Sequence, residues 1–408
     1  MSNATTHIKT DKQLVPALRF KEFEGDWNKV TLGNTSEIVG GGTPETGNDE
    51  YWNGNHQWFT PTELKSKYVS ESKRTISDLG LKKSSAKLLP KGTLLFSSRA
   101  TVGDVSIALR EVCTNQGFQS FIVNEDNSNE FLYNWIIKNK NLFLRRASGS
   151  TFLEISKKEI LKLNALIPSL PEQQKIASFL SAVDEKIQQL TKKKDLLEQY
   201  KKGGLQQLFS GQLRFKDENG NPYPDWEEKK LGEICDYKNG GSFEKLVVDD
   251  GEFNLITLNS IDINGKLKSN HKKVAETDNS LLEGDLIMVL SDVAHGNFLG
   301  LSDIIPDNNY VLNQRMGALK PKVDLIRIYL KTFINYNQKY FKLMGQGSSQ
   351  QNLSKGDILN FKVLFPIIEE QQKIATYISS IDTKIESVNN QITQSQTFKK
   401  GLLQQMFV

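Results

Sequence analysis

The sequence contains little cysteine and no long apolar run. Cys113 and Cys235 are the only cysteines among 408 residues, too few for a disulfide framework or a cysteine zinc site. This scarcity fits a protein of the reducing cytoplasm. No run of about 18 apolar residues occurs, so no membrane span is expected. The polar N-terminal stretch 1–13 also lacks the apolar core of a signal peptide.

Signatures of catalysis are also missing. A methyltransferase that acts on an exocyclic amine holds the flipped base with a Pro-Pro pair, and no such pair occurs. Neither a G-x-G-x-x-G loop nor a GxxxxGK loop is present, and the four histidines lack the spacing of metal ligands. Asp225 and Glu227 resemble a nuclease carboxylate set, but a gap of one residue is too short for the separate strands of such a site. We therefore predict no catalytic residue, metal or cofactor in this chain.

The most prominent feature that is present is an internal repeat at a constant offset of 198 positions. Residues 168–209 align with residues 366–407 without a gap, and about 18 of the aligned pairs are identical. The hexapeptide EQQKIA occurs in both copies, at 172–177 and at 370–375. An ungapped match of this length indicates a duplicated structural element.

Both copies are predicted to form long helices. Their apolar residues recur every three or four positions, which keeps one stripe facing a partner helix. The predicted coiled-coil seam consists of Ile176, Leu180, Val183, Ile187 and Leu190 in the first copy and Ile374, Ile378, Ile381, Ile385 and Val388 in the second. A helix of about 38 residues is ~57 Å long at ~1.5 Å per residue. We expect the two copies to pack on each other, antiparallel; a dimerisation coiled coil between chains is the alternative.

The helix starts differ between the copies. Ser169 is expected to cap the first helix, with Pro171 in the first turn and Glu172 completing a capping box. Ile367 stands at the place that matches Ser169 in the second copy. We therefore expect packing, not a side-chain cap, to hold the start of the second helix.

The segments before the helices read as mixed α/β. Strands are predicted at 93–97, 118–123, 286–290 and 361–365, and helices at 130–145 and 324–343. The predicted fold class is α+β, with two tandem domains of mixed α/β type, each followed by a long helix, and with the helices packed as a pseudo-twofold antiparallel coiled coil. The predicted boundaries are a loose N-terminal tail at 1–17, domains at 18–168 and 211–366, and helices at 169–210 and 367–408.

Two domains held at a set distance suit a two-part DNA target. The net charge of +4 permits nucleic-acid binding without requiring it. Bases and phosphates are contacted by arginine and by small polar side chains on loops. The candidate DNA-contacting residues are Thr43, Ser97, Ser98, Arg99, Thr101, Asn115, Gln116, Arg145, Arg146, Ser150 and Thr151 in the first domain, and Ser242, Ser291, His295, Asn313, Gln314, Arg315, Ser348, Ser349, Gln350 and Gln351 in the second. Ordinary turns are the alternative for each loop, and for Arg145 and Arg146 a solvated helix end.

Over its whole length the chain resembles the specificity subunits of type I restriction-modification systems. The motifs that carry the resemblance are the EQQKIA segments, the helix ends KKGGLQQLF and KKGLLQQMF at 201–209 and 399–407, and the Leu-Arg-Phe openings at Leu18 and Leu213 that lead to a tryptophan and a Leu-Gly pair. The recognition domains of this family vary by nature, so single base contacts do not carry over.

The resemblance implies a division of labour among subunits. Each domain would read one half of a split, asymmetric target in double-stranded DNA, and the helices would set the spacing. Two modification subunits would use S-adenosylmethionine to methylate adenine N6, and two restriction subunits would cleave with ATP and Mg²⁺. A non-catalytic scaffold or oligomerisation protein is the main alternative. A self-sufficient nuclease or methyltransferase is disfavoured by the missing motifs.

Overall fold

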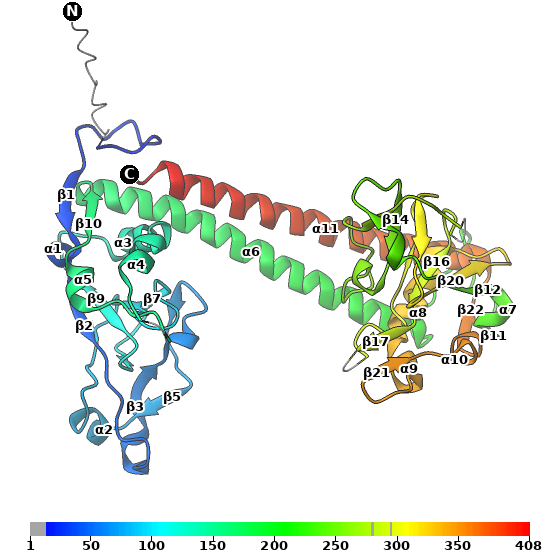
Figure 1. Ribbon diagram of the computed structural model, residues 1–408, viewed down its shortest axis with the longest axis horizontal. Coiled ribbons are helices and arrows are strands. Elements are labelled where there is room, and N and C mark those ends of the chain that lie inside the picture. The colour runs from blue at the N-terminus through cyan, green and yellow to red at the C-terminus, as the bar shows by residue number, and fades with distance from the viewer. Residues whose placement is uncertain (1–13, 150, 279–280, 294–295) are drawn as a thin grey trace, which may run out of the picture. The chain divides into compact units, whose positions relative to one another are not determined.

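The computed structural model describes residues 14–149, 151–278, 281–293 and 296–408 (Figure 1). The chain forms two compact units, Met1–Thr191 with Asn390–Val408, and Lys192–Asn389. Each unit therefore contains one globular domain, the start of the long helix that follows it, and the end of the other long helix. Among the described residues, no helix is long and apolar enough to cross a membrane.

The first domain is built on a five-stranded sheet with the order β2-β9-β6-β7-β4, a three-stranded sheet β5-β3-β8 and the pair β1-β10. Its strands are β1 Asn28–Thr31, β2 Ser36–Gly40, β3 Trp52–Phe59, β4 Tyr68–Val69, β5 Arg74–Ile76, β6 Leu94–Phe96, β7 Val105–Ala108, β8 Cys113–Thr114, β9 Gln119–Val123 and β10 Asn164–Ile167. Its helices are α1 Leu32–Thr35, α2 Asp78–Lys82, α3 Asn129–Lys138, α4 Lys140–Arg146 and α5 Lys157–Leu161.

The second domain contains the sheets β12-β20-β16-β18 and β13-β15-β14-β19 and the pairs β11-β22 and β17-β21. Its strands are β11 Glu227–Lys230, β12 Cys235–Asn239, β13 Val247–Val248, β14 Phe253–Ile256, β15 Lys272–Val274, β16 Leu286–Val289, β17 Ser291–Val293, β18 Ser302–Ile304, β19 Tyr310–Leu312, β20 Met316–Pro321, β21 Gln350–Asn352 and β22 Lys362–Phe365. Its helices are α7 Leu231–Ile234, α8 Arg327–Tyr336, α9 Gln338–Met344 and α10 Lys355–Leu359.

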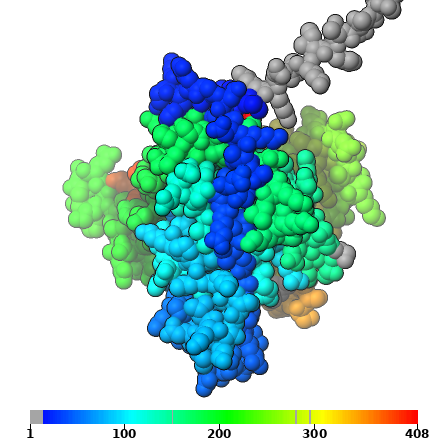
Figure 2. Space-filling model, turned by 90° about the vertical axis from the view of Figure 1, so that its left-hand side faces the viewer, coloured from blue at the N-terminus to red at the C-terminus, as the bar shows by residue number. Residues whose placement is uncertain are grey.

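The strands β3 and β5 and the helix α2 form a lobe of the first domain with a separate small core. It forms the lower end of the domain in Figure 2. Trp52, Trp58 and Ile76 form a small core of their own here. The guanidinium of Arg74 lies 3.5 Å from the centre of the Trp52 ring, a cation–π contact that holds an exposed cation on the lobe.

The predicted strands are confirmed, but each predicted domain helix is in fact two helices. The break falls at Asn139 between α3 and α4, and at Asn337 between α8 and α9. Each asparagine amide donates to a carbonyl four residues back, Trp135 at 3.0 Å and Phe333 at 2.9 Å. This side-chain bond satisfies a helix-end carbonyl and lets the chain turn, as asparagine does well outside helix interiors.

The two long helices are confirmed as α6, Leu170–Phe209, and α11, Ile368–Gln405 (Figure 1). The predicted seam residues are buried or half-buried. In the first unit Asp184 of α6 pairs with Lys399 of α11 at 2.6 Å, and in the second unit Lys201 pairs with Asp382 at the same distance. Asp184 and Asp382 are repeat mates, as are Lys201 and Lys399. In the first ion pair α6 provides the aspartate and α11 the lysine, and in the second ion pair these roles are reversed. An antiparallel pair of helices with pseudo-twofold symmetry requires this exchange.

The glutamate shared by the two EQQKIA segments ties each helix to the opening of its domain. Glu172, with 1% of its surface exposed, accepts two hydrogen bonds from Arg19 at 2.8 Å and one from the Trp27 indole at 3.2 Å. Glu370 repeats this arrangement with Arg214 and Trp226. A buried carboxylate is stable only when it is paired in this way. The expected capping box is therefore wrong for Glu172, whose oxygens serve Arg19 and Trp27.

The glutamine that follows ties the helix to the body of the domain. The Gln173 amide donates to the carbonyl of Pro168 at 3.0 Å and accepts from the backbone amide of Ser128 at 2.9 Å. Gln371 makes the same two bonds, to Pro366 and from Ile326. Helix ends complete each core as well: Phe407 stacks near Phe131 in the first unit, and Phe209 packs on the aromatic residues of α8 in the second.

Candidate nucleic-acid interface

The predicted loops of the first domain converge in one layer. The amide of Ser98 donates to the carbonyl of Gly117 at 2.9 Å, which joins the loop after β6 to the loop before β9. The amide of Ile155 donates to the carbonyl of Ser98 at 2.9 Å, which adds the segment after α4. The hydroxyl of Thr43 hydrogen-bonds to the side chain of Gln116, which adds the loop after β2. Segments far apart in sequence thus form a single surface.

Several of the predicted polar side chains are exposed on this layer. The Arg99 side chain is 48% exposed and lies 3.8 Å from Glu154, and Arg145 is exposed at the end of α4. Arg146 is exposed too, but it pairs with Glu159 at 3.4 Å. Gln116 and Thr151 are exposed, whereas Thr43, Thr101 and Asn115 are half-buried. The arginines on this layer can reach a ligand without unfolding any element.

Four of the predicted contact residues are corrected by their burial. Ser97 and Ser98 are fully buried, Ser291 is 5% exposed, and Asn313 is 1% exposed. The Ser97 hydroxyl hydrogen-bonds to Thr101 at 2.9 Å, and the Ser98 hydroxyl donates to the carbonyl of Gly117 at 3.1 Å. The Ser97 and Ser98 hydroxyls therefore hold the loops and have no surface to offer DNA, whereas the buried Asn313 lines the cavity described below. Ser150 and His295 lie outside the described residues.

The second domain repeats two backbone hydrogen bonds of this layer. The amide of Leu290 donates to the carbonyl of Arg315 at 3.0 Å, and the amide of Leu353 donates to the carbonyl of Leu290 at 2.8 Å. Strand β17 pairs with β21 here, which brings the segment from Ser291 next to the segment from Ser348. Ser242, Gln314, Ser348 and Ser349 are exposed on this layer, while Arg315, Gln350 and Gln351 are half-buried.

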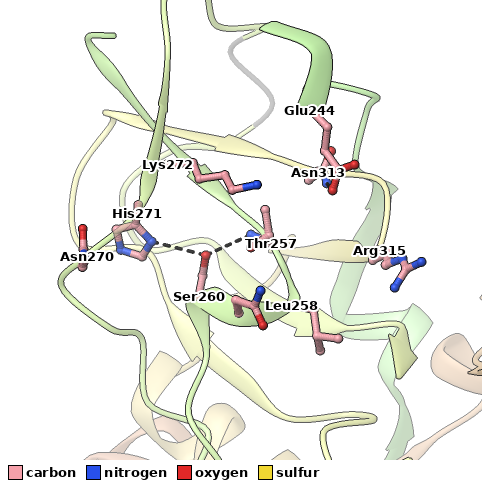
Figure 3. Close-up of a pocket in the computed structure, with 10 residues that line it drawn as sticks. Glu244, Thr257, Leu258, Ser260, Asn270, His271, Lys272, Asn313 and Arg315 are labelled. Carbon is pink, nitrogen blue, oxygen red and sulfur yellow. Dashed lines mark hydrogen bonds between the residues drawn. The ribbon is translucent and has the colours of Figure 1, made fainter. Parts of the chain in front are cut away.

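Beside Arg315 the second domain has a cavity of about 210 Å³, which is lined mainly by residues with polar side chains (Figure 3). Figure 3 shows Lys272 on one side of the cavity and Arg315 on the other. Lining residues that the sequence analysis missed are Glu244, Thr257, Leu258, Asn259, Ser260, Asn270, His271 and Lys272. They come from three separate segments and match no motif, so no signal in the sequence singles them out. The lining contains two cations, several amides and hydroxyls, and the single carboxylate of Glu244. The two cations suit an acceptor-rich partner such as a phosphate or a guanine edge.

A short hydrogen-bond chain organises one wall of the cavity. The Ser260 hydroxyl accepts from the amide of Thr257 at 2.9 Å and lies 3.3 Å from Nδ1 of His271. Burial lowers the pKa of His271, so its imidazole is neutral near pH 7. In the first domain Glu63 takes the place of Ser260: it bonds to the amide of Thr60 at 2.7 Å and reaches the amide of Lys73. The two domains therefore differ at matching places on one framework.

The carboxylates near Asp225 take part in surface ion pairs. Glu227 and Glu228 lie on β11, where they pair with Lys229 at 3.0 Å and with Lys362 at 2.7 Å. Within the described parts of the chain, no group of three or more histidine, cysteine or acidic side chains lies close enough to hold a metal ion.

Comparison with known proteins places this geometry in context. A family model described as "Type I restriction modification DNA specificity domain" matches residues 24–199 and 223–395. The "Type I restriction enzyme MjaIX specificity subunit" of Methanocaldococcus jannaschii is 34% identical over 231 residues, and the alignment covers 53% of each chain. The MjaVIII specificity subunit of the same organism is 24% identical over 409 residues, with 94% of each chain covered.

Solved structures share the fold at low sequence identity. The S subunit of a type I restriction-modification system from M. genitalium has a TM-score of 0.60 and 18% identity, and the match covers 97% of this chain and 99% of that chain. A second structure, described as the "structural basis" of "complex assembly" and "conformational transition of the type I R-M system", has a TM-score of 0.60 and 16% identity. It covers 92% of this chain and 96% of that one.

Proposed function

Because this chain belongs to the type I restriction-modification DNA specificity family, we propose that its two domains each read one half of a split, asymmetric DNA sequence. The observation that carries the proposal is that both domains have the same loop layer but expose different side chains on it. The first exposes Arg99, Gln116 and Arg145, and the second exposes Gln314 and Ser348 beside the cavity of Arg315. One framework with unlike polar groups suits two unlike half-sites.

The helix pair is the proposed ruler between the half-sites. Its ion pairs and buried seam support a fixed register of α6 against α11 within each unit. A coiled coil resists bending better than a loop does, so it keeps a constant number of unread base pairs between two readers. The half-site letters are then a property of the domains, and the spacer is a property of the helices.

Two equivalent faces near the helix ends are the proposed docking sites for two modification subunits. Gly203 and Gly401 are repeat mates inside α6 and α11, and a Cβ atom on either one would meet nothing within 4 Å. Glycine destabilises a helix interior by about 1 kcal/mol relative to alanine. Because a Cβ atom would meet nothing at either position, packing within the chain does not account for glycine in both copies. A backbone without a side chain permits close approach by a partner helix.

The surroundings of these glycines support the same interpretation. Tyr200 and Phe398, one turn earlier, are 58% and 55% exposed, and the glutamines one turn later are identical and exposed in both copies. Exposed aromatic residues at matching positions mark interaction surfaces. One surface that occurs twice suits two copies of one partner. The cofactors S-adenosylmethionine, ATP and Mg²⁺ are then bound by the modification and restriction subunits.

Methylome sequencing of a host that expresses this chain with its modification subunit tests the proposal. We expect N6-methyladenine at one split motif with a constant spacer, and no methylation when either subunit is omitted. The purified chain alone should bind the motif duplex with an affinity that falls as salt rises, because phosphate contacts release counterions. A scaffold would show no sequence preference, and activity of the chain alone would indicate an enzyme.

A further inference from the structure

A lysine of the first domain is buried in an ionic cluster against the helix pair. The side chain of Lys67 is 7% exposed. Its ammonium donates to the carboxylate of Glu130 at 2.9 Å and to the hydroxyl of Ser181 at 2.8 Å, and it lies 3.9 Å from Asp184. The ammonium also lies 5.6 Å from the centre of the Tyr133 ring, a cation–π distance.

The cluster joins three separate elements of the first unit. Lys67 and Glu130 belong to the domain, Ser181 and Asp184 to α6, and Lys399 to α11, where it pairs with Asp184 at 2.6 Å. Two ammonium groups therefore face two carboxylates, so the charges balance. Buried charges that are paired and hydrogen-bonded fix a geometry, because any displacement leaves one of them uncompensated.

Hydrogen bonds keep the carboxylate of this cluster ionised. Burial alone would raise the pKa of Glu130, but hydrogen bonds from Ser181, Tyr68 and Lys67 outweigh it and lower that pKa. The Tyr68 hydroxyl hydrogen-bonds directly to Glu130. The carboxylate thus accepts from both the domain and α6.

The cluster is a further attachment point, in addition to the apolar core and to the hydrogen bonds of Glu172 and Gln173 at the start of α6. Ile176 and Leu180 of α6, with Leu402 of α11 and Met406 just after that helix, share the core of the first domain. Apolar contact is non-directional and tolerates small rotations. The Lys67 cluster lies further along both helices, and an added attachment at that place opposes rotation about the others.

The second domain has a weaker counterpart. The Lys266 ammonium lies 3.4 Å from the carboxylate of Glu386 in α11, the helix that follows the second domain. Both side chains of this pair are largely exposed, at 66% and 62%. Ile328, 38% exposed, occupies the position that repeats Glu130. An exposed ion pair contributes little and is screened by salt. The chain therefore holds its two domains on the helices by unequal means.

We propose that Lys67 is a positioning residue, which fixes the angle of the first domain on the helix pair and so makes the reading of half-site spacing strict to the base pair. The inference rests on the proposed function. One base pair more or less turns a half-site by about 34° around the duplex and moves it by about 3.4 Å. Discrimination between such spacers requires a domain that does not swivel to follow them.

The test uses the complex of this chain with its modification subunit. Duplexes carry the two half-sites at the native spacer, or with one base pair added or removed, and methylation rates are compared. Lys67→Met keeps the length of the side chain and removes its charge. We expect the recognised base sequence of each half-site to be unchanged. The ratio of the methylation rate at the native spacer to the rate at the altered spacers should fall about tenfold. Lys266→Met, the matched control, should discriminate as the unmodified complex does.

A second variant guards against misfolding. Tyr68→Phe removes one hydrogen bond to Glu130 and keeps the ring. We therefore expect a smaller fall in spacer discrimination than for Lys67→Met. If Lys67→Met does not fold, Tyr68→Phe decides. Unchanged spacer discrimination in the folded variant would overturn the inference and leave the proposed function intact. Absence of any split motif for the unmodified complex would overturn both.

Discussion

Exposed arginines are the proposed base-reading residues on the loop layer of the first domain. Arg99 follows β6 and lies 3.8 Å from Glu154, and Arg145 is exposed in the last turn of α4. A guanidinium has a planar set of donors that matches guanine O6 and N7, and it remains charged at any physiological pH. Arg146 pairs with Glu159, so it is the weaker candidate of the two at the end of α4.

We predict that Arg99→Ala or Arg145→Ala weakens or relaxes recognition of one half-site only. A lost base contact should cost about 1–3 kcal/mol at one position of the motif, whereas a lost phosphate contact should lower affinity for all sequences and reduce the salt slope by about 1. Binding to a library of half-site variants at several salt concentrations separates the two. Arg110→Ala, an exposed arginine outside these loops, is the control.

Loss of both half-sites in either variant would contradict the independence of the domains. Unchanged binding in both variants would remove the arginines from the interface and leave the exposed amides and hydroxyls to read the bases.

Polarity alone misjudged several other residues of the same loops. Ser97, Ser98 and Asn313 have the right chemistry for DNA contact, but they are buried. Whether a loop serine points outward depends on which other segment covers it, and that segment lies far away in sequence. Lys272 and His271 were missed for the same reason, because the cavity they line is assembled from distant segments.

At the scale of elements, the long helices are structural parts and, in the proposed function, binding surfaces as well. Their first turns are tied to the domains by Glu172 and Glu370, which explains why the EQQKIA segments are alike in both copies. Near their ends the identical residues include exposed ones, for which the fold supplies no reason. The proposed docking of one partner at each copy accounts for that second set.

We predict that Gly203→Leu or Gly401→Leu removes one modification subunit from the complex without harm to the helix. Leucine is a better helix former than glycine by roughly 0.8 kcal/mol, so the free chain should be as stable or more stable in urea. The mass of the complex in solution should fall from two modification subunits to one, and to none in the double variant. Gln188→Leu, at an exposed position elsewhere on α6, should leave assembly unchanged.

Full assembly by both glycine variants would place the docking surface elsewhere on the chain.

The predicted domain helices also show what an apolar pattern leaves undetermined at the scale of elements. Their apolar spacing was right, but Asn139 and Asn337 divide them, because a side-chain amide can take over a carbonyl from the helix ladder.

At the scale of the whole molecule, duplication of a domain followed by a long helix provides two recognition domains of one architecture. The ion pairs Asp184–Lys399 and Lys201–Asp382 are copies of one contact, seen once in each unit. In the proposed function the two copies of the helix bind two copies of one partner, while the domains are free to diverge. The proposed target is then asymmetric in base sequence although the two helices are copies of one element.

We predict that one heptad inserted into α6 within 191–201, with the matching insertion in α11, lengthens the spacer and preserves the half-site letters. Seven residues add about 10.5 Å, close to three base pairs. Methylome sequencing with the altered chain measures both quantities. An insertion of five residues, which turns the following seam by about 140°, should abolish methylation.

A heptad variant with altered letters and an unchanged spacer would show that the helices do not act as the ruler.

The sequence by itself determined the duplication, the two long helices, their apolar seam and their antiparallel pairing. These features follow from periodicity and from an exact offset, which are local or repeated signals. Only the tertiary structure decided which loop side chains are exposed, where the cavity beside Arg315 lies, and how Lys67 is buried against the helices. Those outcomes depend on contacts between distant segments, where burial and the balance of charge are set by neighbours that no local pattern names.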